Sequence, residues 1–362
     1  MTHLTSPRCA LIMAGGTGGH IFPALAVAER LREAGWRVHW LGGLGQEAPT
    51  MEQRLVPPQD FAFEGIQFSG VRGKGLKTLA LLPLRLLRAF WQCWQVMRRV
   101  EPDVVLGFGG YVTFPGGLMA RLTGRPLVLH EQNSIAGLSN TWLAKIATRV
   151  FCAFPNALPK ASWVGNPLRA AFLHLATPAE RFAGRSGPLK LLVLGGSLGA
   201  KALNEVVPQA LSLIPQERRP SVTHQSGEKQ IAELQANYAR AGVQATLTPF
   251  IDNTAQAMAE ADVMVCRAGA STVTEIAAVG TAALFVPFPY AVDDHQTHNA
   301  RFLSEHGAGW LVPQQDLSAP QLAQWLQGLT RTDLLVHAQA ARAQAQLQAT
   351  AEMVRCCEEL TS

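Results

Sequence analysis

The sequence predicts an α/β protein of two doubly wound, Rossmann-like domains that face a central cleft. Two stretches with the same layout carry this prediction. Each is an apolar run that ends in a glycine-rich loop and continues as a helical pattern, and the loops begin at Gly15 and Gly195. These starts are 195 − 15 = 180 residues apart, in a chain whose 362 residues are many for one core. Uncharged apolar runs are typical of strands buried in parallel sheets, which bind ligands beyond their carboxyl ends.

The first opening begins with an apolar run. Residues 9–14 predict a buried parallel strand, and residues 22–31 predict a helix whose first turn can hold Pro23. Four glycines lie between them, and the loop ends at His20. Glycines let the backbone approach a ligand, and the free amides of the following helix favour an anion. The alternative interpretation is a tight turn without a ligand.

The rest of the first half predicts further parallel strands. They are residues 37–42, 104–107, 127–130 and 150–153, and a helix opens at residues 115–120. Glu131, Gln132 and Asn133 follow one of these strands directly, in the place where parallel sheets bind ligands. Residues 165–169 predict a hinge, and residues 47–64 are assigned no definite element.

The second half repeats the layout. Its predicted strands are residues 190–194, 222–227, 246–251, 262–266 and 283–288, with helices between them and from residue 320 onward. Thr272 and Glu275 have the spacing of a capping box, in which Glu275 would have the purely structural role of capping a helix. The same carboxylate, at a helix start beyond a strand, could also accept hydrogen bonds from sugar hydroxyls. His295 and His298 stand three residues apart without an obvious third ligand, which disfavours a metal site.

Residues 65–100 are both basic and apolar. They hold seven Lys and Arg residues and no acidic one, interleaved with leucines and with Trp91 and Trp94. This mixture suits the interface of an anionic membrane, where each basic residue contributes about 1 kcal/mol. The alternative is an ordinary helix packed on the sheet, and it must hold in part because one exposed face cannot take so many apolar residues. Nucleic acid is disfavoured because no known binding motif accompanies the charge.

The composition is that of a globular protein. Hydrophobic residues make up 48% of the chain and charged residues 16%, and the net charge is +5. The six cysteines show neither metal-ligand spacing nor a disulfide-rich pattern, which favours a reducing cytosol. The long uncharged stretches are interrupted by glycine and proline, so we expect no transmembrane helix, and a signal peptide is also not expected.

Seven short motifs occur in order along nearly the whole chain. They are GGTGGH at 15–20, GGY at 109–111, HEQN at 130–133, GNPLR at 165–169, GGS at 195–197, RAGA through Glu275 at 267–275, and QTHNA at 296–300. Each is weak alone, but the ordered set resembles the MurG family, the bacterial N-acetylglucosaminyltransferases that make lipid II. Leu198 and His295 depart from the resemblance, because the family often has Gln at both positions, and the segment 289–294 is slightly longer than usual.

The resemblance implies a GT-B fold and a membrane-bound acceptor. Residues 1–166 would form the acceptor- and membrane-facing domain, with residues 345–362 packing back on it, and residues 167–344 would bind the donor, UDP-N-acetylglucosamine. The acceptor would be lipid I, undecaprenyl-diphospho-N-acetylmuramoyl-pentapeptide, and transfer to its muramoyl 4-hydroxyl would invert the anomeric centre. The protein would lie peripherally on the cytoplasmic face of the bacterial inner membrane, bound to its anionic surface through residues 65–100, with a cell-wall or division complex as a possible partner.

The resemblance also assigns residues to the donor. Ser197 and the amides around it would hold the diphosphate, Phe250 and Ile251 would border the uracil, and Glu275 would bind the ribose. Asn133 and Gln296 would bind the sugar, and Thr17, Gly18 and Gly19 would lie at the reacting centre. The full expected set for UDP-N-acetylglucosamine is Thr17, Gly18, Gly19, Asn133, Arg169, Ser197, Phe250, Ile251, Ala270, Ser271, Thr272, Val273, Thr274, Glu275 and Gln296.

Elementary chemistry gives His20 a role in this reaction. The attacking hydroxyl must lose its proton as an oxocarbenium-like centre forms, and an imidazole with an unperturbed pKa of about 6.5 suits a general base. The alternative is that His20 only orients the loop or the diphosphate. Helix N-terminal amides and Arg169 can stabilise the leaving diphosphate. No Asp-x-Asp sequence is present, so we expect no bound metal or other cofactor, although bulk Mg²⁺ can assist.

Three other functions compete with this one. A different GT-B enzyme or a UDP-sugar epimerase would share the donor half but need another acceptor site. A nucleotide dehydrogenase is disfavoured because Ile21 replaces the last glycine of the dinucleotide fingerprint, and no Walker sequence follows. A non-enzymatic membrane scaffold would explain residues 65–100 but not His20 or Glu275.

Overall fold

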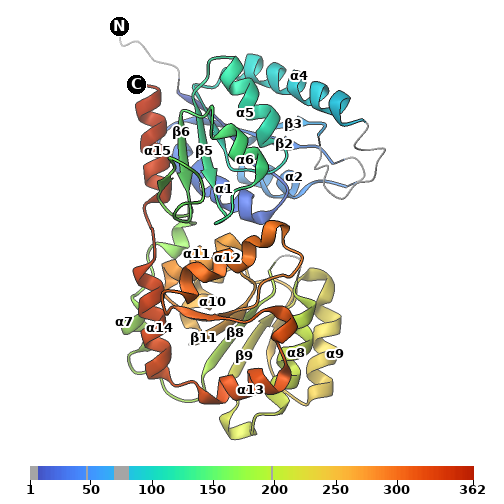
Figure 1. The fold of residues 1–362 in the computed structure, drawn as a ribbon, viewed down its shortest axis with the longest axis vertical. Helices are drawn as coiled ribbons and strands as arrows, with labels where there is room; N and C mark the ends of the chain where they lie inside the picture. The colour runs from blue at the N-terminus through green and yellow to red at the C-terminus, as the bar shows by residue number, and fades with distance from the viewer. Residues whose placement is uncertain (1–6, 46–47, 69–80, 197–198) are drawn as a thin grey trace. The chain divides into compact units, whose positions relative to one another are not determined.

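The chain folds into two compact units. The structure is a computed structural model that describes residues 7–45, 48–68, 81–196 and 199–362. One unit comprises Met1–Arg169 and Leu347–Ser362, and the other comprises Ala170–Gln346 (Figure 1). The chain therefore changes unit after Arg169 and again after Gln346, three and two residues beyond the expected boundaries at 166 and 344.

A seven-stranded parallel sheet forms the centre of the first unit. Its order is β3-β2-β1-β4-β5-β6-β7, so the chain reverses its direction of growth beside β1, where β4 pairs with it. Ligands of such sheets bind where the order reverses, beyond the carboxyl ends of these strands. The strands are β1 (Cys9–Met13), β2 (Arg37–Gly43), β3 (Ala62–Ile66), β4 (Val104–Gly107), β5 (Leu127–Glu131), β6 (Arg149–Cys152) and β7 (Ser162–Trp163).

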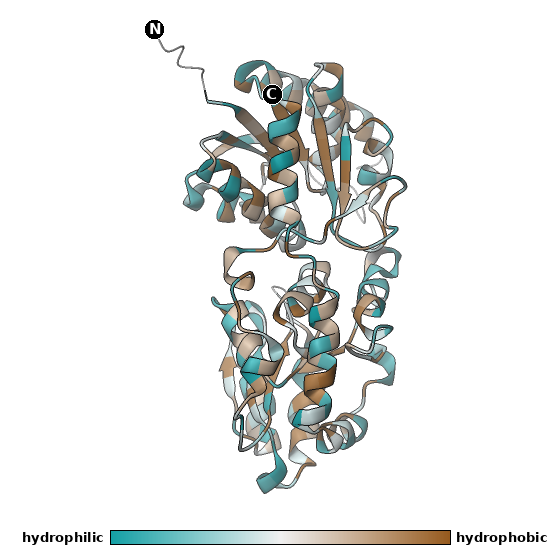
Figure 2. Ribbon diagram, turned by 90° about the vertical axis from the view of Figure 1, so that its left-hand side faces the viewer, coloured by the Kyte–Doolittle hydropathy of each residue, from teal (hydrophilic) through white to brown (hydrophobic). Residues whose placement is uncertain are grey.

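Helices cover both faces of this sheet. Ala10 and Ile12 of β1 share a core with α1 (Gly18–Glu33) and α15 (Ala349–Leu360). Leu11 and Met13 point to the other face, toward α4 (Leu82–Val100). The remaining helices of the unit are α2 (Met51–Leu55), α5 (Thr113–Leu122) and α6 (Leu138–Leu143), with a 3-10 turn at Pro57–Gln59. The strands appear as largely hydrophobic ribbons in Figure 2, as expected for a sheet buried on both faces.

The second unit repeats the plan with six parallel strands. The order β10-β9-β8-β11-β12-β13 reverses between β8 and β11. The strands are β8 (Lys190–Leu194), β9 (Ser221–Gln225), β10 (Thr246–Thr248), β11 (Val263–Cys266), β12 (Ala282–Phe285) and β13 (Gly309–Leu311). The helices are α7 (Pro178–Phe182), α8 (Lys201–Ser212), α9 (Ile231–Ala241), α10 (Thr254–Glu260), α11 (Ala270–Val279), α12 (His295–Ser304), α13 (Ala319–Gly328) and α14 (Arg331–Ala343). Short 3-10 turns occupy Ala170–Phe172, Gln216–Arg218, Glu228–Gln230, Val292–Asp294 and Gln314–Asp316.

The two parallel sheets confirm the predicted pair of doubly wound domains, and two local predictions were wrong. Helix α1 begins at Gly18 rather than at residue 22, so Pro23 lies in its second turn and cannot donate to the carbonyl of Gly19. Helix α11 begins one residue after Gly269, which is its N-cap in extended conformation. Thr272 and Glu275 therefore lie inside that helix and form no capping box.

The cysteines and the helices bear on two further expectations. All six cysteines lie among the described residues, and each is buried and unpaired. In the described segments, no helix combines the length and the apolar character that crossing a bilayer requires.

Candidate functional site

The loop after β1 presents the start of α1. Thr17 is the N-cap residue, with an extended backbone, and its side chain makes no capping hydrogen bond. Its carbonyl accepts from the amides of His20 and Ile21, at 3.1 and 3.2 Å. Within the described part of the chain, the amides of Gly18 and Gly19 have no acceptor, which is the arrangement that binds anions at a helix start.

His20 lies in the first turn of α1, half-buried, against the loop that follows β4. Its Nδ1 is 3.2 Å from the hydroxyl of Thr17. A Cβ atom at Gly109 would stand only 2.9 Å from Cδ2 and 3.1 Å from Nε2 of His20. Gly109 also has a φ of +95°, so both the backbone and the imidazole require glycine there. The two glycine loops of this unit therefore meet at the ring of His20.

The loop after β5 holds the predicted sugar-binding residue Asn133. The backbone and side-chain amides of Asn133 donate to the carboxylate of Glu131, which also accepts from Asn140 at 2.9 Å. Glu131 is buried, and burial raises the pKa of its carboxyl group despite these hydrogen bonds. The side chain of Gln132 is also buried. Its Oε1 would lie 3.6 Å from a Cβ atom at Gly109, the same Cβ atom that the imidazole of His20 excludes. Asn133 is thus fixed at the carboxyl end of the sheet.

Arg169 belongs to the first unit rather than to the second, in which it was expected. Its guanidinium group lies over the ring of Phe22 on α1, 5.4 Å from the ring centroid. Five of the predicted donor-binding residues therefore belong to the same unit as His20: Thr17, Gly18, Gly19, Asn133 and Arg169.

The remaining predicted donor residues follow strands of the second unit. After β8, the amide of Gly196 donates to Gln225 at 3.1 Å, whereas Ser197 and Leu198 lie outside the described residues. Phe250, 56% exposed, and Ile251 follow β10. Gln296 is the second residue of α12, and its side-chain oxygen accepts from the amide of Phe288 at 2.9 Å, beyond the end of β12.

Helix α11 supplies the other predicted donor residues, after β11. Ala270, Val273 and Thr274 are buried, and the hydroxyl of Thr274 donates to the carbonyl of Ala270. The hydroxyl of Ser271 is buried, and no other described residue pairs with it. Thr272 and Glu275 are half-buried on the same helix. The helix thus presents its N-terminus and polar side chains where a Rossmann-like sheet binds its ligand.

Glu52 is the feature of this site that sequence reasoning missed. It is completely buried on α2, and it accepts from the amides of Gly16 and Gly43 and from the hydroxyl of Tyr111. A sequence signal was present in Thr50 and Gln53, which form the capping box that starts α2. That pattern would have found the helix but not the buried carboxylate.

Over the described ranges, no three His, Cys, Asp or Glu side chains are grouped so that they could hold a metal ion. The expectation that no bound metal takes part stays a prediction.

Comparison with known proteins identifies the family. Residues 10–152 match the N-terminal domain of glycosyltransferase family 28, and residues 190–354 match its C-terminal domain. The chain is 70% identical over 359 residues to the UDP-N-acetylglucosamine--N-acetylmuramyl-(pentapeptide) pyrophosphoryl-undecaprenol N-acetylglucosamine transferase of Paracidovorax citrulli, with 99% of this chain and all of that protein covered. The chain belongs to the MurG family of glycosyltransferases. A protein of the same name from Cupriavidus necator is 60% identical over 357 residues, 99% of each chain.

A solved structure agrees with this membership. The crystal structure of Acinetobacter baumannii MurG superimposes with a TM-score of 0.83 and 41% identity, covering 98% of this chain and 100% of that one. The GT-B fold expected from the sequence is thereby confirmed, and the chain is an enzyme of the glycosyltransferase class. The site residues assigned by resemblance remain predictions.

Proposed function

We propose that this protein transfers N-acetylglucosamine from its UDP ester to the muramoyl 4-hydroxyl of lipid I and so forms lipid II. The observation that carries the proposal is the 70% identity, over the full length of both chains, to a relative named for this transfer. The site supports it: glycine loops lie at the switch points of both sheets, where nucleotides and phosphates bind.

His20 serves as the general base of the reaction. A proton on Nδ1 donates to the hydroxyl of Thr17, and the Nε2 lone pair then accepts the proton of the 4-hydroxyl. The oxygen of that hydroxyl forms the new bond to C1 of N-acetylglucosamine as the bond from C1 to the UDP phosphate breaks. The electron pair of the broken bond leaves on the diphosphate, and attack from the opposite side inverts C1.

The leaving diphosphate is stabilised without a resident metal. Two sources supply the compensating positive charge. One is the set of helix N-terminal amides around Ser197 in the second unit, and the other is the guanidinium of Arg169. Bulk Mg²⁺ would act on the acceptor diphosphate rather than at a protein site. The rest of the donor is held by Phe250 and Ile251 at the uracil, Glu275 at the ribose, and Asn133 and Gln296 at the sugar.

Replacement of His20 tests the proposed chemistry. His20→Ala should lower kcat for transfer to a soluble lipid I analogue by about 10²- to 10⁴-fold, because a positioned base contributes that much. The Kd for UDP-N-acetylglucosamine should change less than twofold, and His306→Ala on the surface of the second unit should behave as the wild type. Full turnover by His20→Ala would exclude the base role. Conversion of the donor by the wild type without any transfer to the acceptor would overturn the function itself.

The protein lies on the cytoplasmic face of the inner membrane through α4, as a peripheral protein. One stripe of this helix packs on the sheet through Ala89, Cys93 and Val96, as the alternative interpretation of residues 65–100 required. The other stripe exposes Leu84, Leu87, Trp91 and Trp94, at the i, i+3, i+7 and i+10 spacing of a single helix face. Residues 69–80 of the predicted interval, including Arg72, Lys74 and Lys77, lie outside the described residues.

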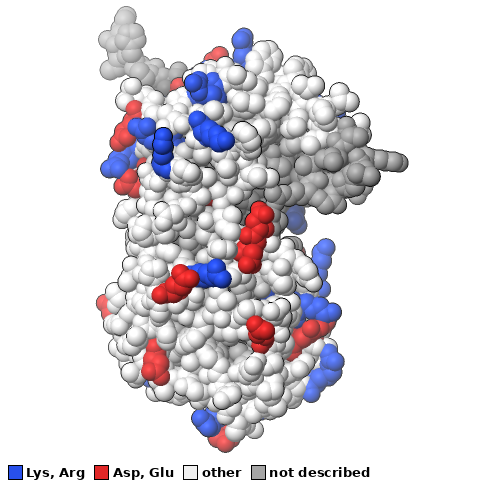
Figure 3. Space-filling view, viewed as in Figure 1, with Lys and Arg blue, Asp and Glu red and all other residues white. Residues whose placement is uncertain are grey.

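Basic residues and a second helix extend this surface. Helix α4 carries four arginines and no acidic residue, and the guanidinium of Arg98 lies 5.7 Å from the ring of Trp94. On α6 the exposed Trp142 has the ammonium group of Lys145 4.2 Å from its ring. On the face drawn in Figure 3, Lys and Arg lie singly or in small groups, some of them beside Asp and Glu. Exposed tryptophans with cations beside them are typical of a membrane interface.

A further inference from the structure

We propose that Glu52 is a positioning residue that fixes the glycine loop in front of His20. Three segments converge on its carboxylate. The segments lie at the carboxyl ends of β1, β2 and β4, which are neighbours in the sheet, and they contribute the amide of Gly16, the amide of Gly43 at the end of β2, and the hydroxyl of Tyr111. This inference rests on the proposed transferase function and adds to it the residue that holds the base in place.

The carboxylate is buried among donors rather than paired with a cation. Glu52 is 0% exposed, and in the described part of the chain no Lys, Arg or His forms an ion pair with it. Oε1 accepts from Tyr111 at 2.5 Å and from Gly43 at 3.2 Å, and Oε2 accepts from Gly16 at 3.2 Å. A buried charge needs such donors, and each of these bonds is strengthened because its acceptor is ionised.

The phenol of Tyr111 stays protonated in this arrangement. Burial, followed by the hydrogen bond to Glu52 and the charge of Glu52, raises the pKa of Tyr111 far above its usual range. Tyr111 therefore acts as a fixed donor over the whole physiological pH range. The same bond joins the loop after β4, whose Gly109 makes room for the imidazole, to the loop that leads into His20.

The side chains of Glu52 and Tyr111 leave no room for a Cβ atom at two neighbouring glycines. A Cβ atom at Gly15 would stand 2.7 Å from Oε1 of Glu52, and a Cβ atom at Gly43 would overlap the hydroxyl of Tyr111. These glycines are therefore needed for Glu52 and Tyr111 rather than for a ligand. A negative charge beneath a loop that binds diphosphate would repel the ligand, so a role in positioning explains Glu52 better than a role in binding.

Helix α2 carries this carboxylate on a rigid support. Thr50 caps the helix, and its hydroxyl donates to the carbonyl of Gly43 at 3.0 Å. The side chain of Gln53 accepts from the amides of Thr50 and Gly45. Glu52 and Thr50 thus bind both polar groups of Gly43, and Gln53 completes the cap of the helix. Arg54 is exposed on the same helix and its side chain takes no part in the cap, so it is the matched control position.

Glu52→Gln tests the positioning role. The amide should keep its oxygen toward Tyr111 and Gly43 and place its NH2 group where the amide of Gly16 now donates, so the loop of Gly16 should be released. We expect peptides that cover residues 14–20 to exchange amide hydrogen for deuterium at least tenfold faster than in the wild type. We also expect kcat with a lipid I analogue to fall about 10- to 100-fold, because small displacements of a catalytic group have effects of that size. The Kd for UDP-N-acetylglucosamine should stay within twofold, and Arg54→Ala should leave both kcat and the exchange of residues 14–20 unchanged.

The possible results separate this inference from the function on which it rests. Unchanged exchange in Glu52→Gln, unchanged kcat, or an equal loss in Arg54→Ala would each overturn the positioning role. If Glu52→Gln does not fold, Tyr111→Phe decides, since it removes one donor and should cause a smaller change of the same kind in exchange and kcat. Failure of the wild-type protein to transfer the sugar would overturn the proposed function, while the exchange measurement would still report on Glu52.

Discussion

Burial sets the protonation state of His130. This residue directly precedes Glu131 and lies three residues before Asn133. His130 is completely buried, and its Nε2 donates to the carbonyl of Gly165 at 2.9 Å. Its Nδ1 accepts from the side-chain amide of Gln132 at 3.0 Å. Protonation of Nδ1 would set two donors against each other inside the protein. Burial accordingly lowers the pKa of His130 to about 4, although the bond to Gly165 opposes this shift.

This shift predicts a loss of stability in mild acid. Between about pH 6.5 and pH 4 the unfolded chain binds a proton at His130 that the folded chain does not, so the free energy of unfolding falls as pH falls through this range. The full effect is about 3 kcal/mol for the first unit. Urea unfolding at pH 7.5 and pH 4.5 measures it. In His130→Gln the pH-dependent part of the loss should shrink, and an equal slope in both proteins would contradict the assignment.

Single residues differ in how far the sequence reveals them. The places of His20 and Asn133 could be predicted, because His20 ends the glycine loop after one apolar strand and Asn133 stands two residues after another, at the edge where parallel sheets bind ligands. Glu52 could not, because a lone glutamate after residues without a clear pattern is usually exposed. Only the fold brings the carboxyl ends of three strands together around it. Arg169 was predicted as a donor-binding residue, but its stacking on Phe22 needed the structure.

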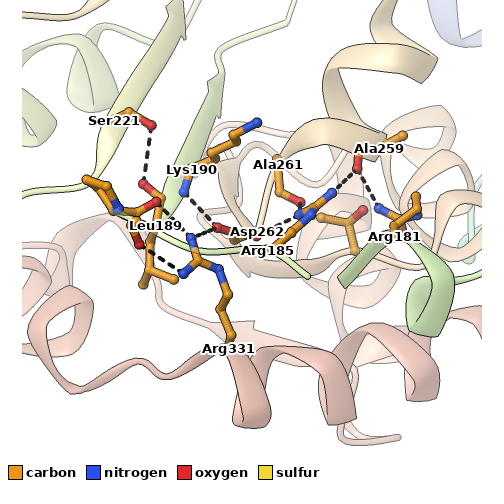
Figure 4. Close-up of polar contacts among 12 residues, drawn as sticks. Arg181, Arg185, Leu189, Lys190, Ser221, Ala259, Ala261, Asp262 and Arg331 are labelled. Carbon is orange, nitrogen blue, oxygen red and sulfur yellow. Dashed lines mark hydrogen bonds and ion pairs between the residues drawn. The ribbon is translucent and has the colours of Figure 1, made fainter. Parts of the chain in front are cut away.

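At the scale of elements, both sheets are fastened by the same device at their amino edges. Asp103 precedes β4 and accepts from the amide of Cys9 at 2.7 Å, and Asp262 precedes β11 and accepts from the amide of Lys190 at 2.9 Å. The short repeats EPDV at 101–104 and EADV at 260–263 mark these two positions in the sequence. In the second unit, Asp262 is in addition paired with Arg185 at 2.6 Å and with Arg331 at 3.0 Å (Figure 4).

The added arginines make Asp262 the more costly residue to remove. Asp262→Ala should lower the free energy of unfolding of the second unit by about 3–5 kcal/mol, because it leaves two partly buried guanidinium groups uncompensated. Asp103→Ala should cost the first unit only about 1–2 kcal/mol, since it leaves one backbone amide unsatisfied. Hydrogen exchange in urea reports on each unit separately. Equal losses in the two variants would show that the arginines add nothing.

The strength of the apolar pattern in the sequence decided which strands could be predicted. The central strands β1, β4, β8 and β11 are apolar and buried apart from Lys190, which starts β8, and the position of each was predicted within one residue. Of the edge strands, β10 was predicted within residues 246–251, whereas β3, β7 and β13 were not predicted. They are short and partly exposed, with β7 consisting of only Ser162 and Trp163, so they lack the apolar runs that mark a central strand.

For the whole molecule, the spacing of two glycine loops was enough to predict two parallel-sheet units. Each unit has its own sheet and core, and the last helix, α15, returns to the core of the first. The apolar run before each loop and the helix after it are local patterns, and they recur because each domain opens with the same strand, loop and helix. The surface proposed to meet the membrane was predicted only as a region, residues 65–100, since composition alone does not show which face of α4 is exposed.

The membrane surface of α4 gives a prediction for the whole protein. Leu84→Glu combined with Trp91→Glu should weaken binding to vesicles with about 30% anionic lipid by at least tenfold, because it removes apolar area and adds charges that the lipid repels. Co-sedimentation with the vesicles at low salt measures this binding. Turnover of a water-soluble lipid I analogue should stay at the wild-type rate, since the replaced side chains face away from the sheet.

A matched control lies on the second unit. Val336 on α14 is as exposed as Leu84, at 61% against 66%, and Val336→Glu should leave vesicle binding unchanged. Raising the salt concentration should weaken the binding of the wild type but not abolish it, because the basic residues are screened whereas the leucines and tryptophans are not. If the double variant binds as tightly as the wild type, α4 is not the docking surface. If Val336→Glu loses binding equally, an added carboxylate anywhere on the protein is enough, and the stripe on α4 has no special role.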